Sequence, residues 1–397
     1  MKSVFISLDS LLSRYQSLWR ADPFYSACSG KPAWAEHYPE LYQALFSLSD
    51  EEVERLKHDA SALNLWLTQF IPDLAQLDQL SSLPCREEHL LDFSSRRYAG
   101  IPGRKLEQIA SLSYHVIQHH KGSEWLEWCS GKGYLGRLLA SESSELVTSL
   151  EYQDDLCQSG QAEADKQKLP MTFVQGDALS QQVESVFNVN QHAVALHACG
   201  DLHVSLLKIG TKLRLPAISI SPCCYHLIQN DDYQPLSAEG REACLQLKRQ
   251  DLRIPLQETV TGGERVKRHR FLEMSYRLGF DLLLREQLGI TQYIPIPSIK
   301  KSSLNEGFEV FCYWASEKKK IRLPDVNFSL YQEAGELRYW QMEKLSLIQQ
   351  AFRRPLEMWL VYDRALYLQS CGYQVELSTF CPKKITPRNI LLHAERK

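Results

Sequence analysis

Three closely spaced glycines give the first indication of chemistry in this sequence. Gly131, Gly133 and Gly136 follow the apolar run 125–128 and lead directly into a second apolar run, 134–140. Glycine adopts positive φ without strain and lets the backbone come into contact with a ligand. The helix that follows adds unpaired N–H groups and the positive end of a dipole. The segment predicts a cradle for a nucleotide cofactor, although a strand-to-helix turn can also use glycine only to bend.

Two acidic residues follow later apolar runs and fit such a cofactor. Glu151 comes directly after the run 146–150, where a carboxylate can accept hydrogen bonds from both hydroxyls of a ribose. Asp177 follows the run 171–174, where a carboxylate can accept from an adenine amino group. Each has a plain alternative, since an exposed Glu often follows a strand and a Gly-Asp pair often forms only a turn.

Two further segments carry reactive side chains at the same kind of position. Residues 197–201 (HACGD) follow a fourth apolar run, and residues 221–226 (SPCCYH) follow a fifth. In an open parallel sheet, ligands bind outside the carboxyl ends of the strands. We therefore expect all five strand ends to contribute to one site.

The elements that would position these residues alternate in type. Short apolar runs separated by helical stretches indicate a parallel sheet with crossover connections. The predicted strands are 125–128, 146–150, 171–174, 193–197 and 217–220, with a helix at 105–119. The pattern stops after Tyr225 and resumes with a helix at 356–370 and two strands at 373–380 and 389–393.

Regions outside this alternation have other patterns. Residues 1–92 have helical spacing, with Ser49 opening one helix. Within 228–350 the sequence predicts a helix at 270–288, a strand at 308–314 and several basic clusters.

Composition limits the class of protein. The 397 residues, 44% of them hydrophobic, suffice for two or three compact units. A net charge of −3 excludes a global attraction to nucleic acid or acidic membranes, so such a partner needs a local basic surface. No 18 uncharged apolar residues run together, and we expect a cytoplasmic protein without a membrane partner. The eleven cysteines are scattered without a C-x-x-C pair, which predicts reduced thiols and no metal.

The order of these motifs resembles a known family. Glu127-x-Cys129-x-Gly131-x-Gly133, followed by Glu151 and Asp177, is similar to the successive motifs of class I S-adenosylmethionine-dependent methyltransferases. Cys129 stands where the family usually has glycine, but its side chain is small enough to keep the backbone close to a cofactor. More narrowly, the segments 197–201, 221–226, 362–369 and 386–389 resemble the methyltransferase-like protein 25 group, with a tRNA 2′-O-methyltransferase as a more distant relative.

The resemblance implies a fold and a domain division. The fold is an α/β, Rossmann-like seven-stranded sheet whose last strand returns antiparallel, with a helical N-terminal extension and an insertion after strand 5. The N-terminal region would be 1–92 and the methyltransferase domain 93–397, interrupted at about 228–350.

The resemblance also implies a cofactor, S-adenosyl-L-methionine, and an acceptor that is unidentified, RNA or protein. The residues expected to bind the cofactor are Glu127, Cys129, Gly131, Gly133, Gly136, Glu151, Asp177 and His197. His197 could instead be a core histidine that ends a strand, and the adjacent Cys223 and Cys224 could be small hydrophobic side chains.

Methyl transfer depends mainly on positioning, with a base where the acceptor carries a proton. The candidates are Asp201, Tyr225 and His226, which follow the fourth and fifth strands. Two alternatives remain open: a non-catalytic module that binds an adenosyl cofactor, and an NAD-dependent oxidoreductase. The second does not account for Asp177 or for the two strands at the carboxyl terminus.

Overall fold

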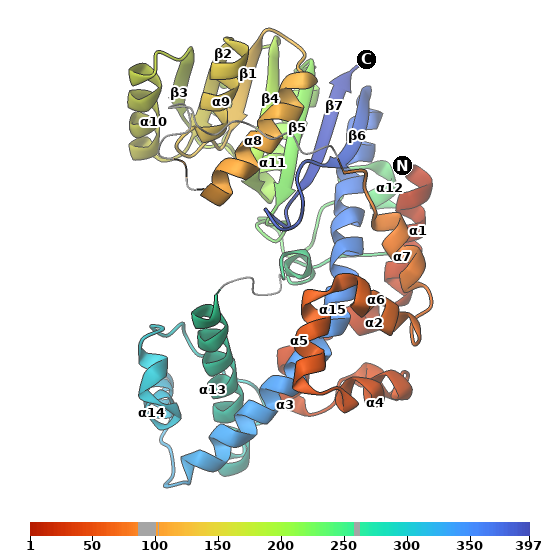
Figure 1. Ribbon diagram of the computed structural model, residues 1–397, viewed down its shortest axis with the longest axis vertical. Helices are drawn as coiled ribbons and strands as arrows, with labels where there is room; N and C mark the ends of the chain where they lie inside the picture. Colours follow the sequence, from red (N-terminus) through yellow and green to blue (C-terminus); the bar gives the residue numbers. More distant parts are fainter. Residues whose placement is uncertain (86–100, 102, 258–262) are drawn as a thin grey trace. The chain divides into compact units, whose positions relative to one another are not determined.

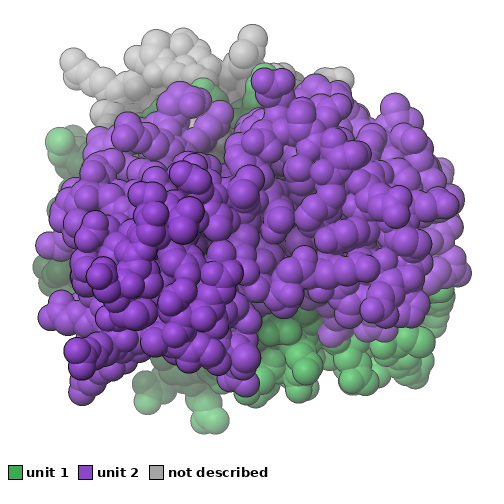
Figure 2. All heavy atoms as spheres, turned by 90° about the horizontal axis from the view of Figure 1, so that it is seen from below, with its two compact units in different colours: residues 1–10, 80–256, 356–397 green, residues 11–79, 257–355 purple. Residues whose placement is uncertain are grey.

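The computed structural model of the chain describes residues 1–85, 101, 103–257 and 263–397 (Figure 1). It separates into two compact units (Figure 2). The first unit comprises residues 1–10, 80–256 and 356–397, and the second comprises residues 11–79 and 257–355. Both units are therefore built from segments that lie far apart in the sequence. The predicted boundary at residue 92 lies outside the described residues, and the predicted domains stay a prediction.

The first unit is built around one seven-stranded sheet with the order β3-β2-β1-β4-β5-β7-β6. The strands are β1 (Glu124–Trp128), β2 (Leu146–Glu151), β3 (Met171–Gln175), β4 (Gln191–Cys199), β5 (Ala217–Cys223), β6 (Tyr373–Thr379) and β7 (Ile390–Arg396). Strands β1 to β5 are parallel, whereas β7 runs antiparallel to both β5 and β6. The predicted fold class is confirmed, including the antiparallel return at the carboxyl terminus.

The central strands are short and apolar because helices cover them. Every residue of β5 is buried, as expected of a parallel strand covered on both faces. The helices of the first unit are the start of α1 (Lys2–Arg14), α8 (Gly103–Gln118), α9 (Tyr134–Ser143), α10 (Asp154–Lys166), α11 (Asp201–Lys212) and α12 (Ala238–Arg241), with 3₁₀ turns at Gln181–Val186 and Asp251–Leu256. Helix α9 contacts β1, β2 and β3, while α11 contacts β4 and β5.

The strand order reverses between β1 and β4, which lie side by side at the centre of the sheet. The connections from β1 to β3 lead away from this point in one direction, and those from β4 to β5 lead away in the other. Loops that leave adjacent strands in opposite directions open a crevice at the carboxyl ends, where ligands bind in such sheets. The predicted site lies at this edge.

The second unit is helical in the described part of the chain. Its helices are α2 (Gln16–Trp19), α3 (Pro23–Ser29), α4 (Pro39–Ser47), α5 (Asp50–His58), α6 (Ala60–Thr68), α13 (Glu264–Leu288) and α14 (Phe308–Lys319), with 3₁₀ turns at Ala33–Glu36 and Ser303–Glu306. Helices α1, α7 (Leu74–Ser81) and the 43-residue α15 (Phe328–Ser370) contribute residues to both units. The predicted start at Ser49 is confirmed: its hydroxyl accepts the Glu52 N–H, and the Glu52 carboxylate accepts the Ser49 N–H in return.

Two sequence predictions in this region were wrong. Residues 308–314 form the start of helix α14, not a strand. Phe308, Phe311, Cys312 and Ala315 are buried at positions i, i+3, i+4 and i+7, a helical spacing that extends beyond the predicted strand. The helix predicted to begin at residue 356 starts at Phe328 and continues through Pro355.

Candidate cofactor site

The turn between β1 and α9 has an unusual backbone. Cys129, Gly131 and Gly133 all adopt positive φ, at 55°, 59° and 66°. The Ser130 N–H donates to the Leu150 carbonyl of the neighbouring strand at 2.9 Å, and the Gly133 N–H donates to the Ser130 carbonyl at 3.0 Å. These bonds fix the turn at the end of β1, directly before the N-terminus of α9.

The three glycines of the turn differ in what a side chain would meet at each position. A Cβ atom added to Gly136 would overlap the carboxylate of Glu127 and the end of Met171, and one added to Gly133 would overlap Phe173. These two glycines are closely packed against neighbouring side chains. A Cβ added to Gly131 would meet no atom within 4 Å, so this glycine faces open space.

Glu151 holds the turn from the end of β2. Its Oε2 accepts the Gly131 N–H at 2.8 Å, and its Oε1 accepts the Gln153 N–H at 3.0 Å. The residue is 8% exposed. Each carboxylate oxygen has two lone pairs, so both oxygens retain capacity to accept from ligand hydroxyls.

A pocket of about 400 Å³ opens beside this turn. Its lining comes from the ends of β1, β2 and β3 and the start of α11: Cys129, Leu150, Glu151, Tyr152, Gly176, Asp177, Ala178 and Leu202. The volume falls in the range of small-molecule pockets. Asp177 is exposed there, and its Oδ1 accepts the Leu179 N–H at 2.9 Å. The structure thus brings together the predicted Cys129, Glu151 and Asp177.

Glu127 lies beneath the glycine turn. It is 3% exposed, and its Oε2 accepts a hydrogen bond from the Ser149 hydroxyl at 2.7 Å. Burial raises the pKa of Glu127 to about 7, against the opposing effect of its hydrogen bonds from Ser149 and the Gly136 backbone. Glu127 therefore supports the turn from inside and does not line the pocket. Burial, together with Glu151, Cys199 and Asp177, raises the pKa of Cys129 to about 12, so its thiol is neutral.

The segments that follow β4 and β5 are bound to each other. The Gly200 N–H donates to the Cys223 carbonyl at 3.3 Å, and the Asp201 N–H donates to the Leu227 carbonyl at 3.0 Å. Gly200 has φ of 55°, and a Cβ there would overlap the Leu227 backbone. This close approach requires glycine at position 200.

The three predicted catalytic residues lie in different surroundings. Asp201 begins α11, accepts the Gln229 N–H at 2.8 Å through Oδ2 and lines a second pocket of about 790 Å³. Tyr225 is 1% exposed, and its ring packs against the Arg364 guanidinium, 5.2 Å from the ring centroid. His226 is half-buried, with no hydrogen-bond partner at its buried Nδ1 within the described residues. Burial, and secondarily Arg253, lowers the pKa of His226.

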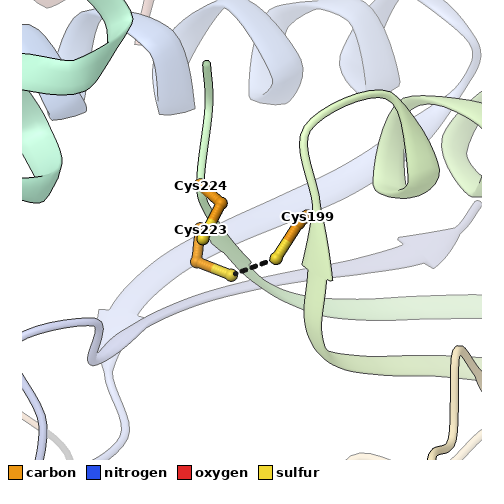
Figure 3. A group of neighbouring side chains, drawn as sticks. All are labelled: Cys199, Cys223 and Cys224. Carbon is orange, nitrogen blue, oxygen red and sulfur yellow. Dashed lines mark hydrogen bonds between the residues drawn. The ribbon is translucent and has the colours of Figure 1, made fainter. Parts of the chain in front are cut away.

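The side chain of His197 lies outside the described residues, so its predicted contact is not located. The sequence analysis missed Tyr152 and Leu202, which line the first pocket directly after Glu151 and Asp201. Both could have been found from the sequence, because each directly follows an acidic residue that was already a candidate, Glu151 or Asp201. It also missed that Cys199, Cys223 and Cys224 form one cluster (Figure 3).

In the part of the chain described, no helix has the length and apolar character needed to cross a bilayer.

Comparison with known proteins identifies the segment that contains this site. Residues 104–231 match the family model of a methyltransferase domain. The match begins in α8 and ends just after β5, so it includes the glycine turn, both carboxylates and the pocket. This agrees with the fold class and with the function predicted from the sequence, methyl transfer to an acceptor not yet identified.

Curated relatives match a segment of similar length. The chain is 32% identical over 130 residues to glutathione S-transferase C-terminal domain-containing proteins of Homo sapiens and Macaca fascicularis. The match covers 32% of this chain and 20% of each relative, so the chain spans about a fifth of their length.

Solved structures with partial similarity include two methyltransferases. The Pyrococcus abyssi tRNA (uracil-54, C5)-methyltransferase in complex with S-adenosyl-L-homocysteine is 18% identical, covers 30% of this chain and 29% of its own, and has a TM-score of 0.26. Coclaurine N-methyltransferase bound to N-methylheliamine and S-adenosylhomocysteine is 11% identical, covers 92% of this chain and 100% of its own, and has a TM-score of 0.30.

Proposed function

We propose that this protein is an S-adenosyl-L-methionine-dependent methyltransferase of the methyltransferase-like protein 25 group. The observation that carries the proposal is the open space in front of Gly131, beside the 400 Å³ pocket that Glu151 and Asp177 line. The match of residues 104–231 to a methyltransferase domain supports the same activity.

The residues present fit an adenosyl cofactor. Gly131 would let the backbone approach it, Glu151 would accept from the ribose hydroxyls, and Asp177 would accept from the adenine amino group. Gly133, Gly136 and Glu127 would keep the turn in shape from inside. When bound, the cofactor supplies an electrophilic methyl group, and the contribution of the protein is to orient the reactants and to exclude water.

The acceptor side of the site is assigned to Asp201 and His226. Asp201 would position the acceptor from the second pocket. His226 has a lowered pKa and is therefore neutral near pH 7, which suits a group that accepts a proton. Tyr225 is buried against Arg364, which supports a positioning role for this residue.

The acceptor class is proposed as RNA or protein, with RNA favoured by a pocket of about 330 Å³ in the second unit. Its lining combines cations with aromatic rings: Lys57, Lys267, Arg268, Arg270, Phe271, Tyr339 and Trp340, together with His58, Glu54 and Glu264. Cationic side chains beside aromatic faces suit phosphates and stacked bases.

We propose a cytoplasmic location, since none of the eleven cysteines, all within the described residues, forms a disulfide.

Tritium transfer from methyl-labelled S-adenosylmethionine tests the proposal. The full chain is incubated with separated pools of RNA, protein and small metabolites, and Asp201→Asn is the matched variant. We expect label in one pool with the wild-type protein and at least tenfold less with the variant. Cofactor binding without transfer to any pool would instead identify a non-catalytic binding module.

A further inference from the structure

Three cysteines meet where β4 and β5 end. Cys199 is the last residue of β4, Cys223 is the last residue of β5, and Cys224 follows it. Their sulfur atoms all lie within 4.8 Å of one another, and the Sγ atoms of Cys199 and Cys223 are 3.4 Å apart (Figure 3). Among the residues described, these three form a group that could hold a metal ion, and neither Asp201 nor His226 belongs to it.

The backbone builds this cluster through two irregularities. The parallel register between β4 and β5 shifts between Leu196 and Cys199, and the shift makes Cys199 the partner of Cys223. Cys224 then adopts a left-handed φ of 46°, which is uncommon for a residue with a side chain. The turn keeps its sulfur beside that of Cys223 (Figure 3).

The same backbone makes the cluster rigid. The Gly200 N–H donates to the Cys223 carbonyl, and the Leu227 N–H donates to the Cys224 carbonyl at 3.0 Å. Three ligands are therefore held on two segments that are bonded to each other, with no room for a side chain at position 200. A site preformed in this way loses little conformational entropy when an ion binds.

The ligand set and spacing suit zinc. Thiolate sulfur lies about 2.3 Å from zinc, so two sulfurs on one tetrahedral ion are roughly 3.8 Å apart, close to the spacing of this cluster. Three thiolates and Zn²⁺ together carry one negative charge. Arg388 carries a positive charge on the segment beside β5, where its carbonyl accepts the Ser221 hydroxyl at 3.2 Å.

We propose that Cys199, Cys223 and Cys224 bind one zinc ion and leave its fourth coordination position for water or an acceptor atom. Three protein ligands with an open position are typical of zinc sites that take part in chemistry. Cys199 and Cys224 are half-buried and Cys223 is buried. Because Cys129 directly follows β1 and Cys199 ends the neighbouring strand β4, the ion would lie near the cofactor site. The assignment replaces the expectation from sequence that no metal is bound, and it does not depend on the proposed methyl transfer.

Metal content of the full chain tests the proposal. The protein is purified under reducing conditions, loaded with zinc, dialysed and analysed by plasma mass spectrometry. We expect one zinc per chain in the wild type and in the control Cys244→Ser, whose thiol is exposed and outside the cluster. Cys199→Ser and Cys223→Ser should retain less than a tenth of that amount. Loading with Co²⁺ should give a thiolate-to-cobalt charge-transfer band in the wild type and the control that the cluster variants lack.

Folding and oxidation are controlled separately. Circular dichroism verifies that each variant is folded, and Cys224→Ala at the half-buried turn provides a second cluster variant should Cys199→Ser fail to fold. A maleimide count verifies that all eleven thiols of the wild type are reduced before loading. A reduced wild type that takes up neither zinc nor cobalt overturns the proposal, as does full zinc content in the cluster variants. A Cys199–Cys223 disulfide that forms in place of metal uptake would also overturn it.

Discussion

Replacement of Gly131 by arginine separates ligand binding from backbone strain. Gly131 has φ of 59° and open space where its side chain would begin. Any other residue there costs about 1–2 kcal/mol of folding free energy, because L residues are disfavoured in the left-handed region. Beyond this cost, arginine would occupy the approach to the 400 Å³ pocket and block an adenosyl ligand.

The matched control is Gly289→Arg. Gly289 ends α13 in the second unit, has φ of 67° and also has no atom within 4 Å of an added Cβ. Both variants should therefore lose a similar amount of stability without ligand. At a ligand concentration one hundred times Kd, the wild type and the Gly289 variant should gain about 2.7 kcal/mol from binding.

The assay is a thermal shift with S-adenosylmethionine, S-adenosylhomocysteine and NAD. We expect the two adenosyl ligands to raise the midpoint of the wild type and of Gly289→Arg, and to leave Gly131→Arg unchanged. An equal ligand shift in Gly131→Arg would refute the placement of the cofactor at this turn. A shift with NAD alone would favour an oxidoreductase.

Three further predictions follow from the same geometry. Because the pKa of Glu127 is raised from 4.5 to about 7, the folded state keeps a proton that the unfolded chain releases between these values. The free energy of unfolding of the wild type should fall as pH rises through this window, by on the order of 3 kcal/mol, whereas that of Glu127→Gln, measured by chemical unfolding, should not show this fall. Parallel pH profiles of the two proteins would contradict the assigned pKa. Gly200→Ala should lower the free energy of unfolding by about 2 kcal/mol or more, because the added Cβ overlaps the Leu227 backbone. The control Gly263→Ala, whose Cβ would meet no atom within 4 Å, should cost less than half as much. Equal costs would rule out the close approach of Gly200 to Leu227. Asp201→Asn keeps an oxygen that accepts the Gln229 N–H, so this variant should retain the thermal shift that the adenosyl ligands give the wild type. Its turnover should fall at least tenfold. Unchanged turnover would remove Asp201 from the catalytic residues.

The sheet could be predicted from the sequence because its strands are short apolar runs separated by turn residues. All seven predicted strands of the sheet are present within a few residues of their expected bounds. The prediction was wrong at 308–314, where a window of seven residues was too short to distinguish helical from alternating burial. It also placed the start of the last helix at residue 356, whereas the helix runs through Pro355, a residue rarely found inside a helix.

The pocket could be predicted in part. Glu151 and Asp177 follow strands, and the topology of a parallel sheet brings such residues to one edge. The inward position of Glu127 could not be inferred, since it depends on which face of β1 packs against Gly136. The cysteine cluster escaped prediction because its members are separated by 24 residues and meet only through a shift of register between β4 and β5.

Direct binding of S-adenosylmethionine shows whether an adenosyl site lies at the carboxyl edge of the sheet. Isothermal titration of the full chain should give one site per chain, with S-adenosylhomocysteine as a competitor. Glu151→Ala removes the acceptor of the Gly131 N–H and should weaken the affinity at least tenfold. Absence of binding to the wild type, or an affinity that Glu151→Ala leaves unchanged, would rule out an adenosyl site at this turn.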